Sequence, residues 1–313
     1  MLWAFFCIIS VFIATAVSEP SAPDGFWLDA KWLQDGEILL TGANYRGLYI
    51  WSESGLDTIS TDWKAGYRPA ISTDGKVTFT GYAETDGEGV VHLYNFSQRK
   101  SSPIYNGYHP GPPVFTPGGD IAFSDGEEIF IYSVDGELID KLPGGAYLIA
   151  ALENGFFWCD RDGRAFRMDG TTGDILPVAL DFQIKSEKYI FAPKASTDGR
   201  FIVAEELGGS MILFDTRDLS VRHLPIGDTP RFVDNPFGIM FMRLLDNGTE
   251  IIDNNLYFFH LDEEHFGEIF EVFKSNPPDM IIINADYSPK FGLLVVSRDG
   301  RVFRKELDIK DFK

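Results

Sequence analysis

One fifteen-residue pattern occurs twice in this chain, 137 residues apart. Residues 155–169 read GFFWCDRDGRAFRMD and residues 292–306 read GLLVVSRDGRVFRKE, with seven identical positions. Each copy opens on a glycine, continues through an apolar run and turns at Arg-Asp-Gly-Arg before a Phe-Arg pair. Because Asp-Gly between apolar segments is a strong β-hairpin signal, the pattern predicts one hairpin that is repeated at long range.

Weaker copies of this hairpin occupy the interval between the two matches. A glycine opens the apolar strand at intervals of 36 to 54 residues, with a mean near 43. The seven strand-opening glycines are Gly36, Gly75, Gly119, Gly155, Gly199, Gly238 and Gly292. A second match, STDGK at 72–76 and STDGR at 196–200, spans 124 residues, or about three such intervals. The sequence therefore predicts about seven copies of one β unit.

Each unit combines a strand that is apolar at nearly every position with a second, aromatic strand and a variable stretch. A strand that is apolar on both faces needs cover on both sides. Four-stranded sheets stacked around an axis supply that cover, so we expect an all-β fold, a β-propeller of about seven blades. Six blades are the alternative, because the 54 residues between Gly238 and Gly292 have room for an insertion.

Two local details follow from the same pattern. The Asp-Gly pairs that end at Gly163 and Gly300 suit two-residue type I′ turns, in which both residues need positive φ. The outer strand of the last sheet has two possible sources: the tail at 306–313, or the segment Phe26–Leu28 crossing over from the other end of the chain. The second route would fasten the two ends of the chain together.

Two segments resemble a known propeller repeat. RPAISTDGK at 68–76 and PKASTDGR at 193–200 are similar to the TolB-type, WD40-like (PD40) repeat, which typically reads Pro-Ala-x-Ser-Pro-Asp-Gly-Lys. Thr73 and Thr197 stand where that repeat has proline, and the Gly-His and Trp-Asp signatures of WD40 repeats are absent. The resemblance implies a periplasmic or secreted propeller, in a family whose roles range from protein docking to carrying an enzyme site.

The first residues resemble an export signal. Residues 2–17 are apolar and uncharged, which is shorter than the roughly 20 residues of a membrane-spanning helix, and a small-x-small Ala-Thr-Ala sequence ends at Ala16. We expect a signal peptide at 1–16, a propeller at 17–313 and a secreted or periplasmic location, with an uncleaved anchor as the alternative. Once the signal is removed, Cys159 is the only cysteine, so no internal disulfide can form and burial must hold the fold.

The charge of the chain limits its partners. Asp and Glu total 47 against 27 Lys and Arg, which gives a formal net charge of −20. A nucleic-acid ligand requires a basic face that displaces counterions, and no Lys/Arg cluster of that kind is present in the sequence. We therefore expect no nucleic-acid partner and no membrane insertion after signal cleavage.

Motifs for catalysis and metal binding are weak. Ser210 lies in an expected hairpin loop and not in a G-x-S-x-G elbow, and His260 and His265 lack H-E-x-x-H spacing. We assign no catalytic residue. The oxygen-rich loop at 246–255 is a candidate Ca²⁺ site, because Ca²⁺ takes six to eight oxygen ligands; a solvated loop is the alternative. Its candidate ligands are Asp246, Glu250 and Asp253.

Aromatic residues crowd two expected connections between units. TDWKAGYRP at 61–69 and YNGYHPGPP at 105–113 precede the second and third units, and such connections gather on one face of a propeller. The candidate binding residues are Trp63, Tyr67, Tyr108 and His109. These side chains are suited to stack on a sugar or clasp a peptide, or else to seal gaps between blades.

Together these features favour a secreted or periplasmic propeller that binds a protein or glycan without catalysis. The alternative is a hydrolase or lyase for a carbohydrate or peptide, with carboxylates converging on the central channel. Two carboxylates about 5 to 9 Å apart at an aromatic channel mouth would support the alternative.

Overall fold

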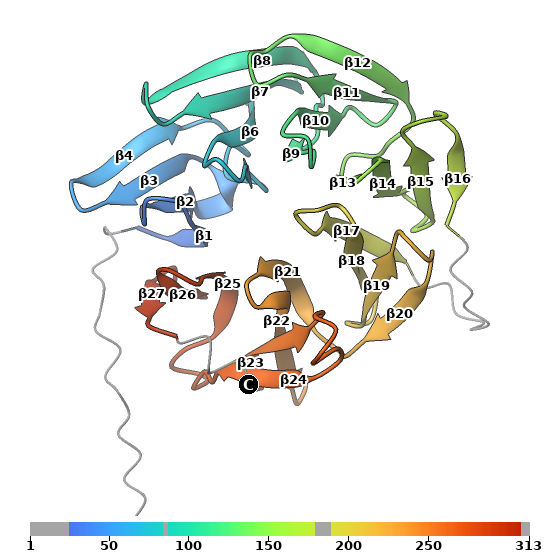
Figure 1. The fold of residues 1–313 in the computed structure, drawn as a ribbon. Coiled ribbons are helices and arrows are strands. Elements are labelled where there is room, and N and C mark those ends of the chain that lie inside the picture. Colours follow the sequence, from blue (N-terminus) through green and yellow to red (C-terminus); the bar gives the residue numbers. More distant parts are fainter. Residues whose placement is uncertain (1–24, 84–86, 179–188, 308–313) are drawn as a thin grey trace, which may run out of the picture.

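The computed structural model describes residues 25–83, 87–178 and 189–307, which form a ring of seven antiparallel sheets (Figure 1). The predicted seven-bladed β-propeller is confirmed, and the six-blade alternative is wrong. Within each blade the strands follow one another in chain order from the axis outward. The expected signal peptide at 1–16 lies outside the described residues. Within the described ranges, no helix is long and apolar enough to cross a membrane.

Blade 1 comprises β1 (Trp27–Trp32), β2 (Ile38–Gly42), β3 (Leu48–Ser52) and β4 (Gly55–Ser60), and blade 2 comprises β5 (Ala70–Ile71), β6 (Val77–Tyr82), β7 (Glu88–Asn95) and β8 (Lys100–Tyr108). Blade 3 comprises β9 (Val114–Phe115), β10 (Ile121–Ser124), β11 (Glu128–Tyr132) and β12 (Leu138–Pro143), and blade 4 comprises β13 (Ile149–Leu152), β14 (Gly155–Cys159), β15 (Ala165–Asp169) and β16 (Ile175–Pro177). The strands of blades 5 to 7 are β17 (Ile190–Ala195), β18 (Phe201–Glu206), β19 (Met211–Asp215) and β20 (Val221–Leu224); β21 (Asp228–Asp234), β22 (Phe237–Asp246), β23 (Ile251–His260) and β24 (Ile269–Phe273); β25 (Ile282–Ser288), β26 (Gly292–Ser297) and β27 (Val302–Lys305). A single 3-10 turn, η1 (Ala43–Tyr45), joins β2 to β3.

The second strand of a blade is largely buried, as its apolar sequence predicts. Every residue of β2, β6, β10 and β26 is buried, because neighbouring blades cover both faces of the sheet. Each of the seven predicted glycines opens or closely precedes one of these second strands, so the repeat was read in the correct register. Burial of one large apolar side chain contributes about 1.5–3 kcal/mol, and here burial is the main stabilising term.

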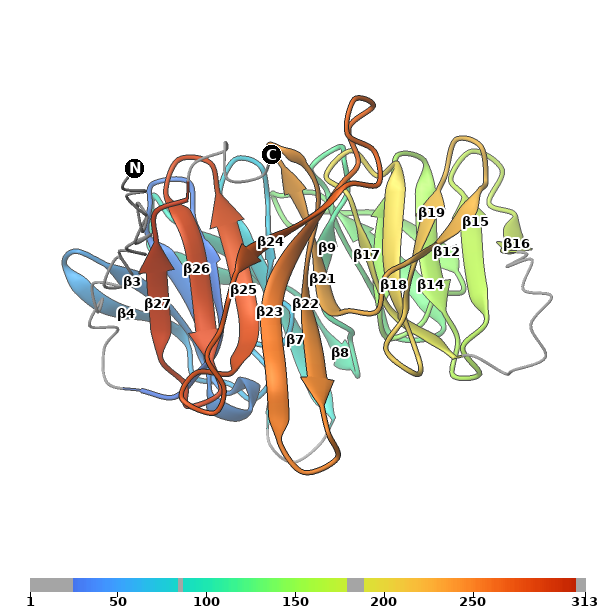
Figure 2. The same ribbon diagram turned by 90° about the horizontal axis from the view of Figure 1, so that it is seen from below.

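The long sixth interval belongs to a complete blade and not to an insertion. Strands β22 and β23 have ten residues each, and their hairpin extends beyond the body of the ring (Figure 2). The outer strand β24 then pairs with β23.

One of the two predicted sources for the outer strand of the last blade is wrong. Trp27 is the first residue of β1, the innermost strand of blade 1, so the segment Phe26–Leu28 does not supply an outer strand for blade 7 and that prediction is wrong. Trp27 N donates instead to Gly300 O at 3.2 Å. An apolar cluster that includes Trp32 and Leu294 closes the ring between blades 7 and 1. Blade 7 has three strands within the described part of the chain, and residues 308–313 lie outside it.

The Asp-Gly turns are three-residue loops with a bulge, so the type I′ prediction is wrong. Gly163 has φ +74°, whereas Asp162 has negative φ. Gly163 N donates to Asp160 O at 3.0 Å, and Asp160 N donates to Arg164 O at 2.9 Å. The Asp160 carboxylate accepts N–H bonds from Asp162 and Arg164 at 2.9 and 2.8 Å. This local bonding favours a type I turn followed by a left-handed glycine.

The two faces of the ring carry different sets of turns. Strands alternate in direction, so the connections between blades and the hairpins between second and third strands lie at one face. We call this the connecting face. The hairpins between first and second strands, and between third and fourth strands, lie at the opposite face.

Candidate functional site

The four predicted binding residues lie together at the connecting face. Two further residues complete the group: Tyr82 at the end of β6 and Tyr147 in the connection before β13. We call the set the aromatic cluster, and it comprises Trp63, Tyr67, Tyr82, Tyr108, His109 and Tyr147. Tyr82 and Tyr147 were missed in the sequence because one belongs to a strand and the other lies in a glycine-rich connection without other aromatic residues nearby.

Ring contacts join the aromatic cluster into two groups, and the hydroxyls of Tyr82 and Tyr147, 3.5 Å apart, connect them. Tyr82 lies 6.0 Å from the Trp63 ring and 6.3 Å from the His109 ring, and His109 lies 4.2 Å from Tyr108. Tyr67 stacks on Tyr147 at 6.4 Å. Trp63 and Tyr108 remain 42% and 67% exposed, so two large rings face solvent at this site. Such rings are common anchors in binding sites because they bury a large area at low entropic cost.

Lys64 lies among three of these rings. Its Nζ is 4.7 Å from the centre of the Trp63 ring, 5.1 Å from Tyr82 and 5.3 Å from Tyr147. It also donates to the Tyr147 hydroxyl at 3.4 Å. Cation–π attraction therefore fixes the rings relative to one another. Burial, and then the neighbouring Tyr147 hydroxyl, raise the pKa of Tyr82, whose neutral hydroxyl donates to Pro110 O.

A groove of about 930 Å³ runs from this cluster across the connecting face. It begins at Tyr108 and His109, crosses the turns of blades 3 and 4, and reaches the start of β17 in blade 5. Its wall is formed by segments 125–127, 145–148, 159–161 and 190–193. Phe191 lines it and is 43% exposed. The volume suits a ligand of several residues or sugar units.

Cys159 also lines the groove. Burial raises the pKa of its thiol to about 12. The thiol therefore stays protonated at neutral pH and lacks the thiolate character of a nucleophile.

The connecting face carries unusual backbone strain. Nine of the described non-glycine residues have positive φ, and seven of them lie in connecting-face loops or in the strand segments that lead from them. These seven are Asn44, Tyr45, Lys64, Arg68, His109, Ala192 and Thr229. Each such conformation costs about 1–2 kcal/mol for an L-residue, and strain of this kind clusters at functional sites.

Charged side chains from four blades meet at the axis of the ring. We call this set the axial cluster, and it comprises Asp29, Lys31, Arg68, Lys194, Glu205, Asp228, Arg231, Asn284 and Asp286. Most lie on the innermost strands β1, β17, β21 and β25, which surround the axis in Figure 1. Arg231 donates to Asp29 at 2.6 Å and to Asn284 at 2.7 Å, and lies 3.5 Å from Asp286.

The two lysines of the axial cluster are held in the same way. Lys31 Nζ donates to Pro69 O at 2.6 Å, and Lys194 Nζ donates to Pro230 O at 2.7 Å. In each case the carbonyl belongs to the next blade. Burial is the main cause that lowers the pKa of Lys31 to about 8 and that of Lys194 to about 7. Both lysines precede a strand-opening glycine by five residues, and this equivalence is the one sequence signal that marks them.

The carboxylates at the axis are engaged by other members of the axial cluster, and the hydrolase alternative stays a prediction. Asp29 and Asp286 are both engaged by Arg231. Burial raises the pKa of Glu205 to about 7, and a side-chain hydrogen bond joins Glu205 to Asp228. Carboxyl groups in direct hydrogen-bond contact are closer than the 5 to 9 Å that glycosidase chemistry uses.

The three predicted calcium ligands lie on the extended hairpin of blade 6. Asp246 ends β22, and its Oδ1 accepts the Gly248 N–H at 2.9 Å. Glu250 lies in the turn, and Asp253 pairs with Leu245 across the hairpin. Among the described residues, no group of three His, Cys, Asp or Glu is arranged to hold a metal ion. Calcium binding by this loop stays a prediction.

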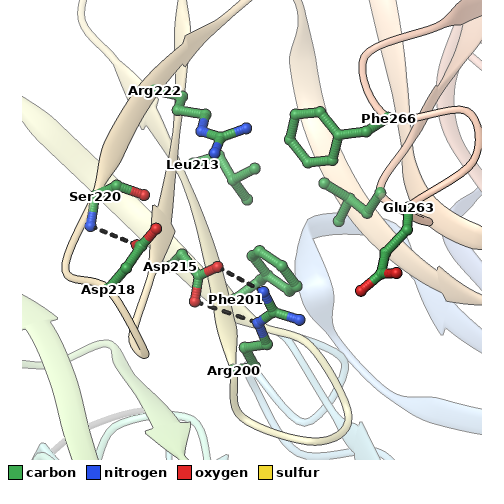
Figure 3. Close-up of a pocket in the computed structure, with 10 residues that line it drawn as sticks. Arg200, Phe201, Leu213, Asp215, Asp218, Ser220, Arg222, Glu263 and Phe266 are labelled. Carbon is green, nitrogen blue, oxygen red and sulfur yellow. Dashed lines mark hydrogen bonds and ion pairs between the residues drawn. The ribbon is translucent and has the colours of Figure 1, made fainter.

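A second, smaller pocket of about 270 Å³ lies at the opposite face between blades 5 and 6 (Figure 3). Its central ion pair is bidentate: Arg200 donates to Asp215 at 2.9 and 3.3 Å. The Arg222 guanidinium lies 4.6 Å from the centre of the Phe266 ring. The charges of this pocket largely compensate one another, which distinguishes it from the connecting face.

Ser210, as expected, lies in a hairpin, where it donates to Glu206.

No family model and no curated protein matches this chain. Solved structures, in contrast, match most of its length. A virginiamycin B lyase from Staphylococcus aureus is 14% identical with a TM-score of 0.61, covering 92% of this chain and 97% of that one. A streptogramin B lyase is 12% identical, with a TM-score of 0.60 and coverage of 91% and 95%. A structure of the mitotic checkpoint complex is 12% identical, with a TM-score of 0.62 and coverage of 89% of each chain.

At such identities the likeness concerns the fold alone. The chain is a β-propeller with a WD40-like fold, and the fold alone does not specify a function. The similarity to the TolB-type repeat stays a resemblance of two short segments.

Proposed function

We propose that this chain is a secreted or periplasmic propeller that binds a segment of another protein in the groove of its connecting face, without catalysis. The observation that carries the proposal is the groove of about 930 Å³ with exposed Tyr108 at one end and exposed Trp63 beyond it in the aromatic cluster. Rings that are fixed by Lys64 and by one another lose little entropy on binding, which favours affinity.

The lining favours a peptide over a glycan. Leu148, Ile190, Phe191, Ala192 and Pro193 give the groove an apolar wall at its inner end. Such a wall favours the burial of apolar peptide side chains. A sugar needs a dense set of polar partners, because each buried hydroxyl left without a hydrogen bond costs about 1–3 kcal/mol. Export is supported by the apolar leader and its Ala-Thr-Ala sequence.

The test is selection of random twelve-residue peptides on the purified chain, followed by calorimetry of the selected peptides. The double variant Trp63→Ala/Tyr108→Ala should weaken binding by at least about 30-fold, or about 2 kcal/mol, because it removes both exposed anchors. The matched control is Phe266→Ala, which removes an aromatic side chain from the opposite-face pocket and should change the affinity less than about 3-fold.

Two results would overturn the proposal. One is selected peptides that bind the double variant as tightly as the unchanged chain, provided that both melt at similar temperatures. The other is a glycan array in which sugars bind the groove and peptides do not.

A further inference from the structure

The cations of the axial cluster carry more hydrogen-bond donors than they use on described residues. Each lysine ammonium carries three donors, and a guanidinium carries five. Lys31 and Lys194 each direct one hydrogen bond to a backbone carbonyl. Arg68 makes no hydrogen bond or ion pair with any described residue, although it is within electrostatic range of Lys194 and Glu205. Several donors therefore remain for a ligand.

The acceptors at the axis are already engaged. Arg231 holds Asp29 and Asp286, whose side chains are only 13% and 24% exposed. With both carboxylates ionised, these three residues together carry one negative charge. They form a buried ion-pair network, and among the described residues neither carboxylate is within ion-pair distance of Lys31, Arg68 or Lys194.

The second carboxyl pair, Glu205 and Asp228, carries one negative charge below pH 7. Burial raises the pKa of Glu205 to about 7, so below this pH Glu205 is protonated beside Asp228. Lys194, whose pKa is lowered to about 7, is charged in the same range. Two negative charges in all therefore face the three positive charges of Lys31, Arg68 and Lys194 below pH 7. About one positive charge is left over, at the centre of a protein with a net charge of −20.

We propose that the axial cluster is a receptor for one carboxylate group, held by Lys31, Arg68 and Lys194. The carboxylate is an Asp or Glu side chain, or the C-terminus, of the peptide bound in the groove, so its identity rests on the proposed function. A singly charged group matches the single uncompensated charge, whereas a doubly charged phosphate does not.

The groove adjoins this receptor along β17, although no residue of the axial cluster lines the groove itself. Its inner end is formed by residues 190–193, and Lys194 follows directly along β17. Arg68 belongs to the same connection as Trp63, five residues further along the chain. Arg68 and Lys194 are half-buried, so a ligand atom is able to reach them. Arg68 and Ala192 are held at φ +53° and +56°, which fixes both sides of the opening.

The inference is tested by thermal melting of the purified chain in sodium acetate, with sodium chloride balancing the ionic strength. Binding to the native state raises the melting temperature with ligand concentration. We expect acetate to raise it at pH 6, with an apparent affinity that falls at least about 10-fold in Lys194→Met and in Arg68→Gln, since each loses a charged donor. The matched control is Lys76→Gln, which removes a cation paired with Asp74 at the opposite face and should leave the acetate effect unchanged.

The pH dependence has a definite sign. As pH falls from 8 to 6, Lys194 gains a proton and Glu205 loses its negative charge, because both have pKa values of about 7. The other charged groups facing Lys194 are Arg68, Arg231 and Lys31, which stay protonated over most of this range. Acetate should therefore bind more tightly at pH 6 than at pH 8, by at least about 3-fold.

Several outcomes would overturn the inference. These are no stabilisation by acetate beyond that of chloride, equal stabilisation in the axial variants, tighter binding at pH 8, or stronger stabilisation by phosphate than by acetate. The double variant Trp63→Ala/Tyr108→Ala should bind acetate normally. If the chain binds acetate but no peptide, only the proposed function is contradicted. If it binds peptides but no acetate, only the carboxylate receptor is contradicted.

Discussion

The two faces of the ring are made by the same seven blades, but they differ in which residues adopt positive φ in their turns. At the opposite face, positive φ falls mostly on glycine, as at Gly75 (+86°) and Gly199 (+71°), with Arg99 and Leu219 as the two exceptions among the described residues. At the connecting face, glycines share that conformation with seven other described residues, among them Lys64 (+60°), Arg68 (+53°) and His109 (+48°). Glycine adopts it freely, whereas other residues are strained. The excess of strained side chains at the connecting face is consistent with the binding role proposed for it.

Charged groups differ between the faces in the same sense. At the opposite face, Lys76 and Arg200 each bond a neighbouring aspartate. At the connecting face and the axis, Lys64, Arg68 and Lys194 have no carboxylate within ion-pair distance among the described residues. Compensated charges contribute to local structure, whereas uncompensated ones are available to a ligand.

The largest expected effect on stability distinguishes two cations of the axial cluster, Arg231 and Lys194. Arg231→Met should lower the free energy of unfolding by about 3–5 kcal/mol, because it leaves Asp29 and Asp286 buried without a partner. Lys194→Met is the matched comparison. It should change stability by less than about 1 kcal/mol, since this lysine has no carboxylate partner in contact and its charge is disfavoured by burial. Urea unfolding at pH 7 measures both, and equal losses would contradict the division into structural and ligand-facing cations.

An intermediate effect is expected at the opposite face. In Gly199→Ala the new Cβ would lie 2.2 Å from the Glu153 backbone nitrogen, at φ +71°, so we expect a loss of about 2 kcal/mol or more. Gly119 occupies the equivalent turn at φ +92° with open space around it. Gly119→Ala should therefore cost only the conformational strain, about 1 kcal/mol. Similar melting temperatures for the two variants would show that close packing of this turn is unimportant.

The smallest effect on stability is expected where strain now exists. Lys64→Gly removes the penalty of φ +60°, but glycine also raises the entropy of the unfolded chain, so the free energy of unfolding should change by less than about 1 kcal/mol. Peptide binding should nevertheless fall, because the rings of Trp63, Tyr82 and Tyr147 lose their shared cation. A large loss of stability with unchanged binding would reverse the assigned roles of the two faces.

The fold was accessible from the sequence because its determinants are local. Each apolar strand with its glycine repeats the same pattern, so Gly36 through Gly292 marked all seven second strands. The gathering of Trp63 and Tyr108 was also predictable, since connections between consecutive blades must meet at one face. The turn at Gly163 was misassigned because the Asp160 side chain, which no turn dipeptide includes, sets its geometry.

The axial cluster was not predictable in the same way. Its members lie between Asp29 and Asp286 in the chain: two come from each of blades 1, 5, 6 and 7, and Arg68 comes from the connection before β5. Only ring closure brings them within reach of one another, and no local spacing encodes that closure. The ion pair of Arg231 with Asp29 joins residues 202 positions apart.

Hydrogen–deuterium exchange of the chain with and without a selected peptide tests the central claim most directly. The claim is that ligands bind at the connecting face. We predict slower exchange on binding in segments 61–69, 105–113 and 144–148, which carry the aromatic cluster, and unchanged exchange in segments 215–222 and 261–268 around the opposite-face pocket. Protection confined to the latter segments would contradict the account.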